Sequence, residues 1–109
     1  MSVPAPPAVS VVMPVLNARA DYLREAVDSI RSQSFQDWEL VVVEDPSPNL
    51  SESLLRGYGD ARIRHFVNPL RTSLAQQLNQ GLAAARGMLV ARMDADDVAE
   101  PNRLAVQVA

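Results

Sequence analysis

Short, almost wholly apolar runs recur along the chain, separated by longer segments of mixed character. Runs in which nearly every side chain is apolar are typical of parallel strands that are buried on both faces of a sheet. The pattern predicts four strands, at residues 9–13, 38–43, 63–67 and 88–93. Because proline lacks an N–H group, we expect Pro14 to end the first of them.

The segments between these runs show helical spacing. Residues 21–32 carry one apolar stripe, made of Leu23, Ala26, Val27 and Ile30. Residues 73–86 predict a second helix, followed by Gly87, with its apolar side at Leu74, Leu78, Leu82 and Ala85. Shorter helices are expected at residues 51–57 and, after Pro101, at residues 102–109.

This alternation of strand and helix with short links predicts the fold class. It indicates an α/β domain with a mostly parallel, Rossmann-like nucleotide-binding sheet flanked by helices. The domain is expected to span residues 9–109. Residues 1–8 are rich in proline and have no basic stretch, so we expect a flexible lead-in and no signal peptide.

Composition and charge exclude several classes of function. The net charge of −3 gives no electrostatic case for binding nucleic acid. Lysine and cysteine are absent and all ten basic residues are arginine, which excludes an ordinary P-loop, Schiff-base lysine chemistry and thiolate metal sites. No apolar run approaches the roughly 20 residues of a membrane-spanning helix, so we expect a cytoplasmic protein, with peripheral membrane attachment of a longer form left open.

An acidic cluster follows the fourth predicted strand. Asp94, Asp96 and Asp97 place three carboxylates within four residues, and their mutual repulsion is relieved by solvent or by a cation. Mg²⁺ and Mn²⁺ prefer such oxygen ligands and usually keep sites for water and substrate phosphates. We therefore expect a divalent metal at Asp96 and Asp94. The alternative is a solvated turn that Asp97 shapes.

Two other strand ends carry polar residues, and ligands of parallel sheets bind outside the carboxyl ends of the strands. Glu44 and Asp45 follow the second strand, where a carboxylate can read a base N–H or ribose hydroxyls. The segment from Pro14 through Leu16 to Asn17 follows the first and can wrap a ligand. Each of these two segments fits an ordinary loop equally well. Among the arginines, Arg71 is the better candidate for a diphosphate contact and Arg92 the weaker.

These segments together resemble the N-terminal half of the family-2 glycosyltransferases with the GT-A fold. VSVVMPVLNA at residues 9–18 is similar to that family's opening strand, and YLREAVDSI with QSF at residues 22–30 and 33–35 to its first helix and turn. WELVVVED at residues 38–45 resembles its second strand. LNQG and ARG at residues 78–81 and 85–87 resemble the helix before its metal motif. ARMDADD at residues 91–97, followed by PNRL at residues 101–104, resembles the metal-motif segment itself.

The resemblance implies transfer of a sugar, with inversion, from a nucleotide-diphosphate donor to an acceptor hydroxyl. It implies that Asp45 binds the base, that Asp96 coordinates the metal, that Asp94 lies against the ribose and diphosphate, and that the loop from Pro14 to Leu16 packs on the nucleotide. A UDP-sugar is the favoured donor, and a saccharide or lipid the expected acceptor. Leu16 and Pro46 depart from the family's usual tyrosine and glycine, which changes the expected contacts with the donor.

Family members run well beyond the acidic motif, into a half that holds the acceptor site and the catalytic base. We therefore expect residues 9–109 to be a truncated, donor-binding domain, and we assign no catalytic residue within it. Two alternatives stay open. An apolar strand before DADDV at residues 94–98 also fits haloacid-dehalogenase-like phosphatases, with Asp94 as nucleophile and Asp96 as general acid and base. A non-catalytic nucleotide-binding module is the other.

Overall fold

A computed structural model of the chain describes residues 5–109. Its elements follow in strict alternation: β1 (Val9–Val15), α1 (Ala20–Arg31), β2 (Trp38–Glu44), α2 (Glu52–Gly57), β3 (Ile63–Val67), α3 (Leu74–Ala84), β4 (Leu89–Arg92) and α4 (Arg103–Val108). The strands form one four-stranded sheet in the order β3-β2-β1-β4, and each neighbouring pair is parallel. The predicted parallel α/β sheet is confirmed. In the described part of the chain, no helix is long and apolar enough to cross a membrane.

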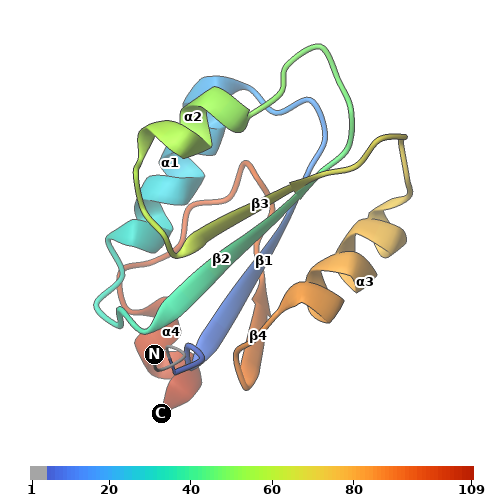
Figure 1. Cartoon of the computed structure of the whole chain (residues 1–109). Coiled ribbons are helices and arrows are strands. Elements are labelled where there is room, and N and C mark those ends of the chain that lie inside the picture. The colour runs from blue at the N-terminus through green and yellow to red at the C-terminus, as the bar shows by residue number, and fades with distance from the viewer. Residues whose placement is uncertain (1–4) are drawn as a thin grey trace.

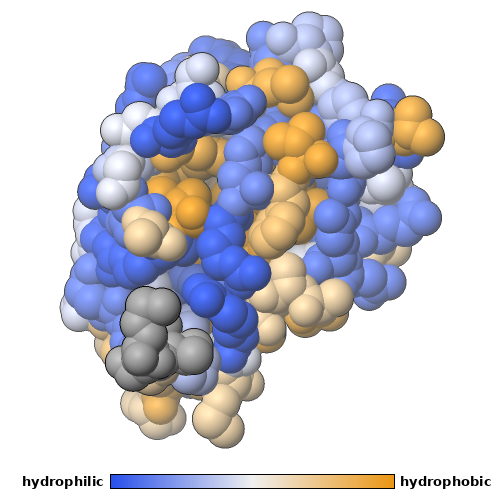
Figure 2. All heavy atoms as spheres, viewed as in Figure 1, coloured by the Kyte–Doolittle hydropathy of each residue, from blue (hydrophilic) through white to orange (hydrophobic). Residues whose placement is uncertain are grey.

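Helices cover the two faces of the sheet unequally (Figure 1). Helix α1 and the short α2 and α4 contribute to the larger core, and α3 lies alone on the other side. The larger core contains the predicted α1 stripe, together with alternate residues of the strands. The core under α3 has three buried residues, Val12, Val41 and Val43. In Figure 2, apolar groups reach the surface in the region between the sheet and α3.

We expected Pro14 to end the first strand because proline lacks an N–H group, and this expectation is wrong. β1 continues to Val15, and Pro14 pairs in register with Val43. The Val12 carbonyl accepts from Met93 N on the β4 side, and the Val15 carbonyl accepts from Asp45 N on the β2 side. Backbone groups alternate sides along a strand, so the missing N–H of Pro14 would face β4, whose pairing has already ended at Arg92. The proline therefore costs the sheet no hydrogen bond.

Helix α3 is turned relative to the predicted orientation: Leu78 packs partly buried against the small core, as expected, but Leu74 and Leu82 do not. Leu74 and Leu82 are about half exposed, and the buried positions are Gln77 and Gly81. A Cβ atom at Gly81 would lie 2.3 Å from Val12 Cγ1, so only glycine allows this approach of helix to sheet. The helix begins as a capping box, in which Gln76 N donates to the Ser73 hydroxyl at 3.1 Å and Ser73 N donates to Gln76 Oε1 at 2.9 Å.

The expected lead-in at residues 1–8 is only partly described, because residues 1–4 lie outside the described part of the chain. Residues 5–7 have no regular structure. Ala8 already joins the sheet, since its N–H donates to the Asp37 carbonyl at 3.2 Å and its carbonyl accepts from Leu89 N at 3.1 Å.

Candidate functional site

A pocket of about 680 Å³ lies at the carboxyl ends of β1 and β4, beside the start of α3. It brings together six of the residues predicted for the site from three separate segments of the sequence: Pro14, Leu16, Asn17, Arg71, Asp94 and Asp96. Carboxyl ends of parallel strands share one edge of a sheet, which is why residues so distant in sequence meet here. Two predicted residues, Glu44 and Asp45, do not line the pocket.

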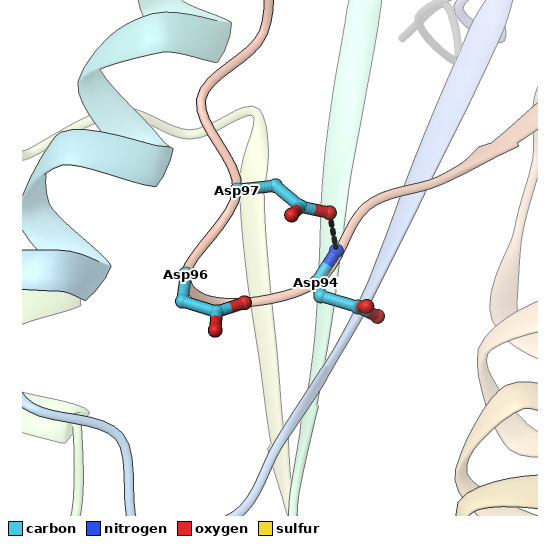
Figure 3. Close-up of side chains that lie close together, drawn as sticks. All are labelled: Asp94, Asp96 and Asp97. Carbon is cyan, nitrogen blue, oxygen red and sulfur yellow. Dashed lines mark hydrogen bonds between the residues drawn. The ribbon is translucent and has the colours of Figure 1, made fainter.

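The acidic residues form a tight turn directly after β4 (Figure 3). Met93 is buried and its N–H extends the ladder to Val12, which fixes where the turn begins. Asp97 closes the turn, because its Oδ2 accepts from Asp94 N at 3.1 Å while its own N–H donates to the Asp94 carbonyl at the same distance. The side chain of Asp97 therefore shapes the turn that presents Asp94 and Asp96.

This turn has the donor set of a site for a hard cation. Asp94, Asp96 and Asp97 each offer a carboxylate oxygen, and these atoms lie within 4.8 Å of one another. Asp96 and Asp97 are exposed and Asp94 is partly so, which leaves room for water and phosphate oxygens in the remaining coordination positions. Among the described residues, none donates a hydrogen bond to the carboxylate of Asp96. The residues present therefore fit a magnesium or manganese ion.

Arginines balance this negative charge around the pocket. Arg19, Arg71 and Arg92 line it together with Asp94 and Asp96. Arg92 pairs with Asp94 at 3.2 Å, and Arg19 pairs with Asp21 at 2.8 Å. Guanidinium groups bind phosphate oxygens in bidentate fashion, so the same cavity holds groups for a metal and groups for a diphosphate.

The loop after β1 forms one wall of the pocket. Asn17 has a positive φ of 54°, a left-handed conformation that asparagine tolerates better than most residues. Its Oδ1 accepts from Asn49 Nδ2 at 3.0 Å, which ties this loop to the loop after β2. Leu16 is partly exposed and presents an apolar surface to the cavity. Asn17 thus has a structural task in addition to its place in the pocket wall.

Asp45 lies behind the pocket wall and is fully buried. Its carboxylate accepts from Thr72 N at 2.7 Å, from the Thr72 hydroxyl at 2.9 Å and from Asn68 Nδ2 at 2.9 Å. Burial alone would raise the pKa of Asp45, but these hydrogen bonds and the charge of Arg71 outweigh it, so the pKa lies below its usual value. The charged carboxylate anchors the segment 68–72 that carries Arg71 into the pocket.

Glu44 points to the opposite face of the sheet from Asp45. It is fully buried on the side of α2, where it accepts from Ser51 N at 3.1 Å and from the Ser51 hydroxyl at 3.1 Å. His65 Nε2 lies 2.8 Å from Oε1 of Glu44, the same oxygen that accepts from Ser51 N. Glu44 therefore joins β2 to β3 and to the start of α2, and the structure does not bring it to the pocket. His65 of β3 is thus a partner of this buried acid.

Sequence reasoning missed several residues that build the pocket, among them Tyr22, Thr72 and Gln77. Gln77 is buried, and its Nε2 donates to the carbonyls of Val15 at 3.0 Å and Val43 at 3.1 Å. It thereby fixes the ends of β1 and β2 from α3. The Ser73-x-x-Gln76 capping box was a visible signal for a helix start at this edge. No sequence signal marks Gln77, because its role depends on the close approach at Gly81.

Comparison with known proteins decides the family. The family model described as glycosyl transferase family 2 matches residues 10–109. The chain belongs to glycosyltransferase family 2. This assignment displaces the phosphatase interpretation of the DADDV segment.

Curated relatives carry the same designation. A protein of Bacillus subtilis named putative glycosyltransferase EpsE is 38% identical over 107 residues, which cover 94% of this chain and 38% of that protein. An uncharacterized glycosyltransferase of Methanocaldococcus jannaschii is 36% identical over 104 residues, covering 93% of this chain and 36% of that protein. The chain thus spans little more than a third of the length of these two relatives.

Solved structures support the GT-A type of sheet. Residues 1–349 of Staphylococcus aureus TarS, in complex with UDP-GlcNAc, match with a TM-score of 0.85 at 24% identity, covering 92% of this chain and 30% of that one. That likeness shows the fold. The mannosyltransferase PcManGT of Pyrobaculum calidifontis, in complex with GDP-Man and Mn²⁺, matches with a TM-score of 0.83 at 28% identity, covering 94% of this chain and 32% of that one.

Proposed function

We propose that this domain binds the nucleotide-diphosphate sugar donor of a family-2 glycosyltransferase together with a divalent metal. The observation that carries the proposal is the shared pocket, in which the acidic turn at Asp94 and Asp96 lies beside Arg71 and Arg92. A metal and a diphosphate need these two kinds of group side by side. The mannosyltransferase PcManGT, which holds GDP-Man and Mn²⁺, offers a precedent among related structures.

Different residues of the pocket contact the metal, the diphosphate and the nucleoside. Asp96, whose carboxylate accepts no hydrogen bond from any described residue, is the main metal ligand, and Asp94 is the second. Arg71, held in place through Thr72 and Asp45, faces the diphosphate. The loop from Pro14 to Asn17 packs against the nucleoside. A bound metal neutralises the charge that develops on the diphosphate as it leaves.

The reaction that this site serves is sugar transfer with inversion. The oxygen of an acceptor hydroxyl, on a saccharide or lipid, forms a bond to the anomeric carbon while the bond from that carbon to the diphosphate breaks on the opposite side. The hydroxyl proton passes to a base. Among the described residues we assign none as this base, and we place it with the acceptor site in the part of the relatives that this chain does not cover.

Calorimetry tests the donor-binding proposal. We expect UDP or GDP, and their sugars, to bind the chain more tightly in the presence of Mn²⁺, with UDP-sugars examined first. Asp96→Asn should weaken Mn²⁺-dependent binding by at least about tenfold, because it removes a ligand charge. Asp37→Asn is the matched control, since it makes the same change at an exposed position just before β2, at the far end of the sheet.

Two outcomes would contradict the proposal. Failure of all these nucleotides to bind, with and without Mn²⁺, would rule out donor binding by this domain. If the nucleotide affinity were the same with and without Mn²⁺ and the same in Asp96→Asn, the domain would have a nucleotide site without a metal.

A further inference from the structure

Arg92 occupies a position that the metal and diphosphate roles alone do not explain. It is the last residue of β4 and lines the pocket, and its side chain is half exposed. Its Nε and Nη2 atoms lie 3.3 Å and 3.2 Å from one atom, Oδ1 of Asp94. Both contacts fall on an oxygen of the proposed metal site, so the guanidinium stands where it competes with a cation for Asp94.

The backbone of Arg92 is fixed while its side chain is free to turn. Residue 92 pairs with Val12 in the sheet, and its carbonyl accepts from Arg103 Nη2 at 2.9 Å. The next residue, Met93, is buried. Among residues 5–109, the side chain is held by hydrogen bonds to Asp94 alone, and such exposed pairs contribute little to stability. A modest competing interaction is therefore enough to move the guanidinium.

A metal ion supplies that competition. The carboxylate oxygens of Asp94, Asp96 and Asp97 lie within 4.8 Å of one another, so an ion bound among them sits within a few ångströms of Asp94 Oδ1. Two positive charges at that separation repel each other. The guanidinium then leaves Asp94, and the pocket that it already lines is the place where a phosphate would receive it.

We propose that Arg92 is an exchangeable counter-ion, which neutralises Asp94 when no metal is bound and pairs with a donor phosphate when metal is bound. The inference rests on the metal and donor site of the proposed function and adds a coupling between the binding of metal and the binding of diphosphate. Arg92 lowers the affinity for metal alone and raises the affinity for the diphosphate once metal is present. It thereby favours occupation by metal and diphosphate together over occupation by metal alone.

The test compares the chain with Arg92→Gln and with the control Arg56→Gln. Arg56 pairs with Glu52 on the exposed face of α2, so its replacement makes the same change in net charge away from the pocket. Titration of Mn²⁺ alone, followed by electron paramagnetic resonance of the free ion, should show about three- to tenfold tighter binding in Arg92→Gln. The control should differ from the parent by less than about twofold.

The second measurement is UDP affinity at saturating Mn²⁺. Arg92→Gln should weaken it by about tenfold, because a charge-assisted contact to phosphate is lost. Arg92→Lys keeps the charge but not the bidentate fork, so its Mn²⁺ affinity should stay close to that of the parent. Circular dichroism confirms that each variant is folded.

The outcomes separate this inference from the proposed function. If the parent chain binds Mn²⁺ through Asp96 and Arg92→Gln has the same Mn²⁺ affinity, the inference is wrong and the metal site stands. If Arg92→Gln bound Mn²⁺ more tightly but bound UDP as well as the parent does, Arg92 would not pair with the phosphate. That result would also overturn the proposal. If neither the parent nor Arg92→Gln binds Mn²⁺, both the inference and the metal site are wrong.

Discussion

Two carboxylates, one near each end of the sheet, are in opposite circumstances. At the amino end, Glu39 is 1% exposed and accepts hydrogen bonds from Ser10, Arg64 and Arg86. At the carboxyl end, Asp96 is exposed and accepts none from the described residues. A charge that the protein itself satisfies has no capacity left for a ligand. Comparison of the two ends therefore separates an acid that holds the fold together from one that is available for binding.

The partners of Glu39 explain why it is structural. They come from β1, from β3 and from the link between α3 and β4, and Gly87 N adds a bond to the Ser10 hydroxyl at 2.8 Å. Removing the carboxylate would release these three segments from β2 at once. The acidic turn, in contrast, is held mainly by bonds between Asp94 and Asp97, so its carboxylates can change partners without disturbing the sheet.

The largest effect should follow from Glu39→Gln. We expect the free energy of unfolding at pH 7 to fall by about 3 kcal/mol, because the buried network loses its charge while Ser10 stays buried with its hydroxyl poorly paired. Urea denaturation followed by circular dichroism measures the change. A loss below about 1 kcal/mol would show that the amino end is no more structural than the acidic turn.

The same variant should respond differently to acid. Burial alone would raise the pKa of Glu39, but hydrogen bonds from Ser10, from the Arg86 backbone and from both arginines lower it from 4.5 to about 2. Its contribution is therefore complete above pH 4.5 and is lost as the pH falls towards 2, which amounts to about 3 kcal/mol. The stabilities of the parent and Glu39→Gln should converge over this window, and parallel curves would contradict the assignment.

A smaller effect is expected from Gly87→Ala. A Cβ atom there would lie 2.8 Å from Ser10 N and 2.9 Å from the Val9 carbonyl carbon, so the backbone must shift. We expect a loss of about 2 kcal/mol in unfolding free energy. Gly57→Ala is the matched control, because a Cβ at Gly57 meets nothing within 4 Å. Equal stability of the two variants would mean that the amino end is less tightly packed than its geometry indicates.

The smallest change in stability should come from the open end. Asp96→Asn removes one of three neighbouring carboxylates that repel each other, and its unfolding free energy should stay within about 0.5 kcal/mol of the parent. In the same denaturation series, 1 mM Mn²⁺ should stabilise the parent more than the variant. A large loss without metal would place Asp96 with Glu39, as part of the framework.

Much of the fold follows from local pattern. The short runs rich in apolar residues identified all four strands, although β3 and β4 include charged residues or histidine, and the stripe from Leu23 to Ile30 is the buried face of α1. The orientation of helix α3 followed only in part from its leucines, because Leu78 packs against the sheet but the fully buried positions of the helix are Gln77 and Gly81. A polar residue and a glycine give no hydrophobic signal, and their burial depends on the Val12 side chain in another element.

The site was predictable to the extent that it depends on strand ends. Placing Asp94, Asp96, Leu16 and Arg71 at one edge required only a parallel sheet. The separation of Glu44 from Asp45 depends on β2 continuing one residue further than expected, to Glu44. Because successive side chains of a strand point to opposite faces, that single residue decides which acid lies on the side of α3. Burial of both acids likewise depends on partners from loops whose paths the sequence does not reveal.

Because Glu44 and Asp45 point to opposite faces at the end of β2, each holds a different loop, and the two loops can change independently. Glu44 secures the start of α2 on one side, and Asp45 secures the segment 68–72 on the other. Substitutions that reshape the pocket wall around Thr72 leave the anchor of α2 in place. A change in the shape of the pocket wall and a loss of the α2 anchor are therefore separable effects of substitution.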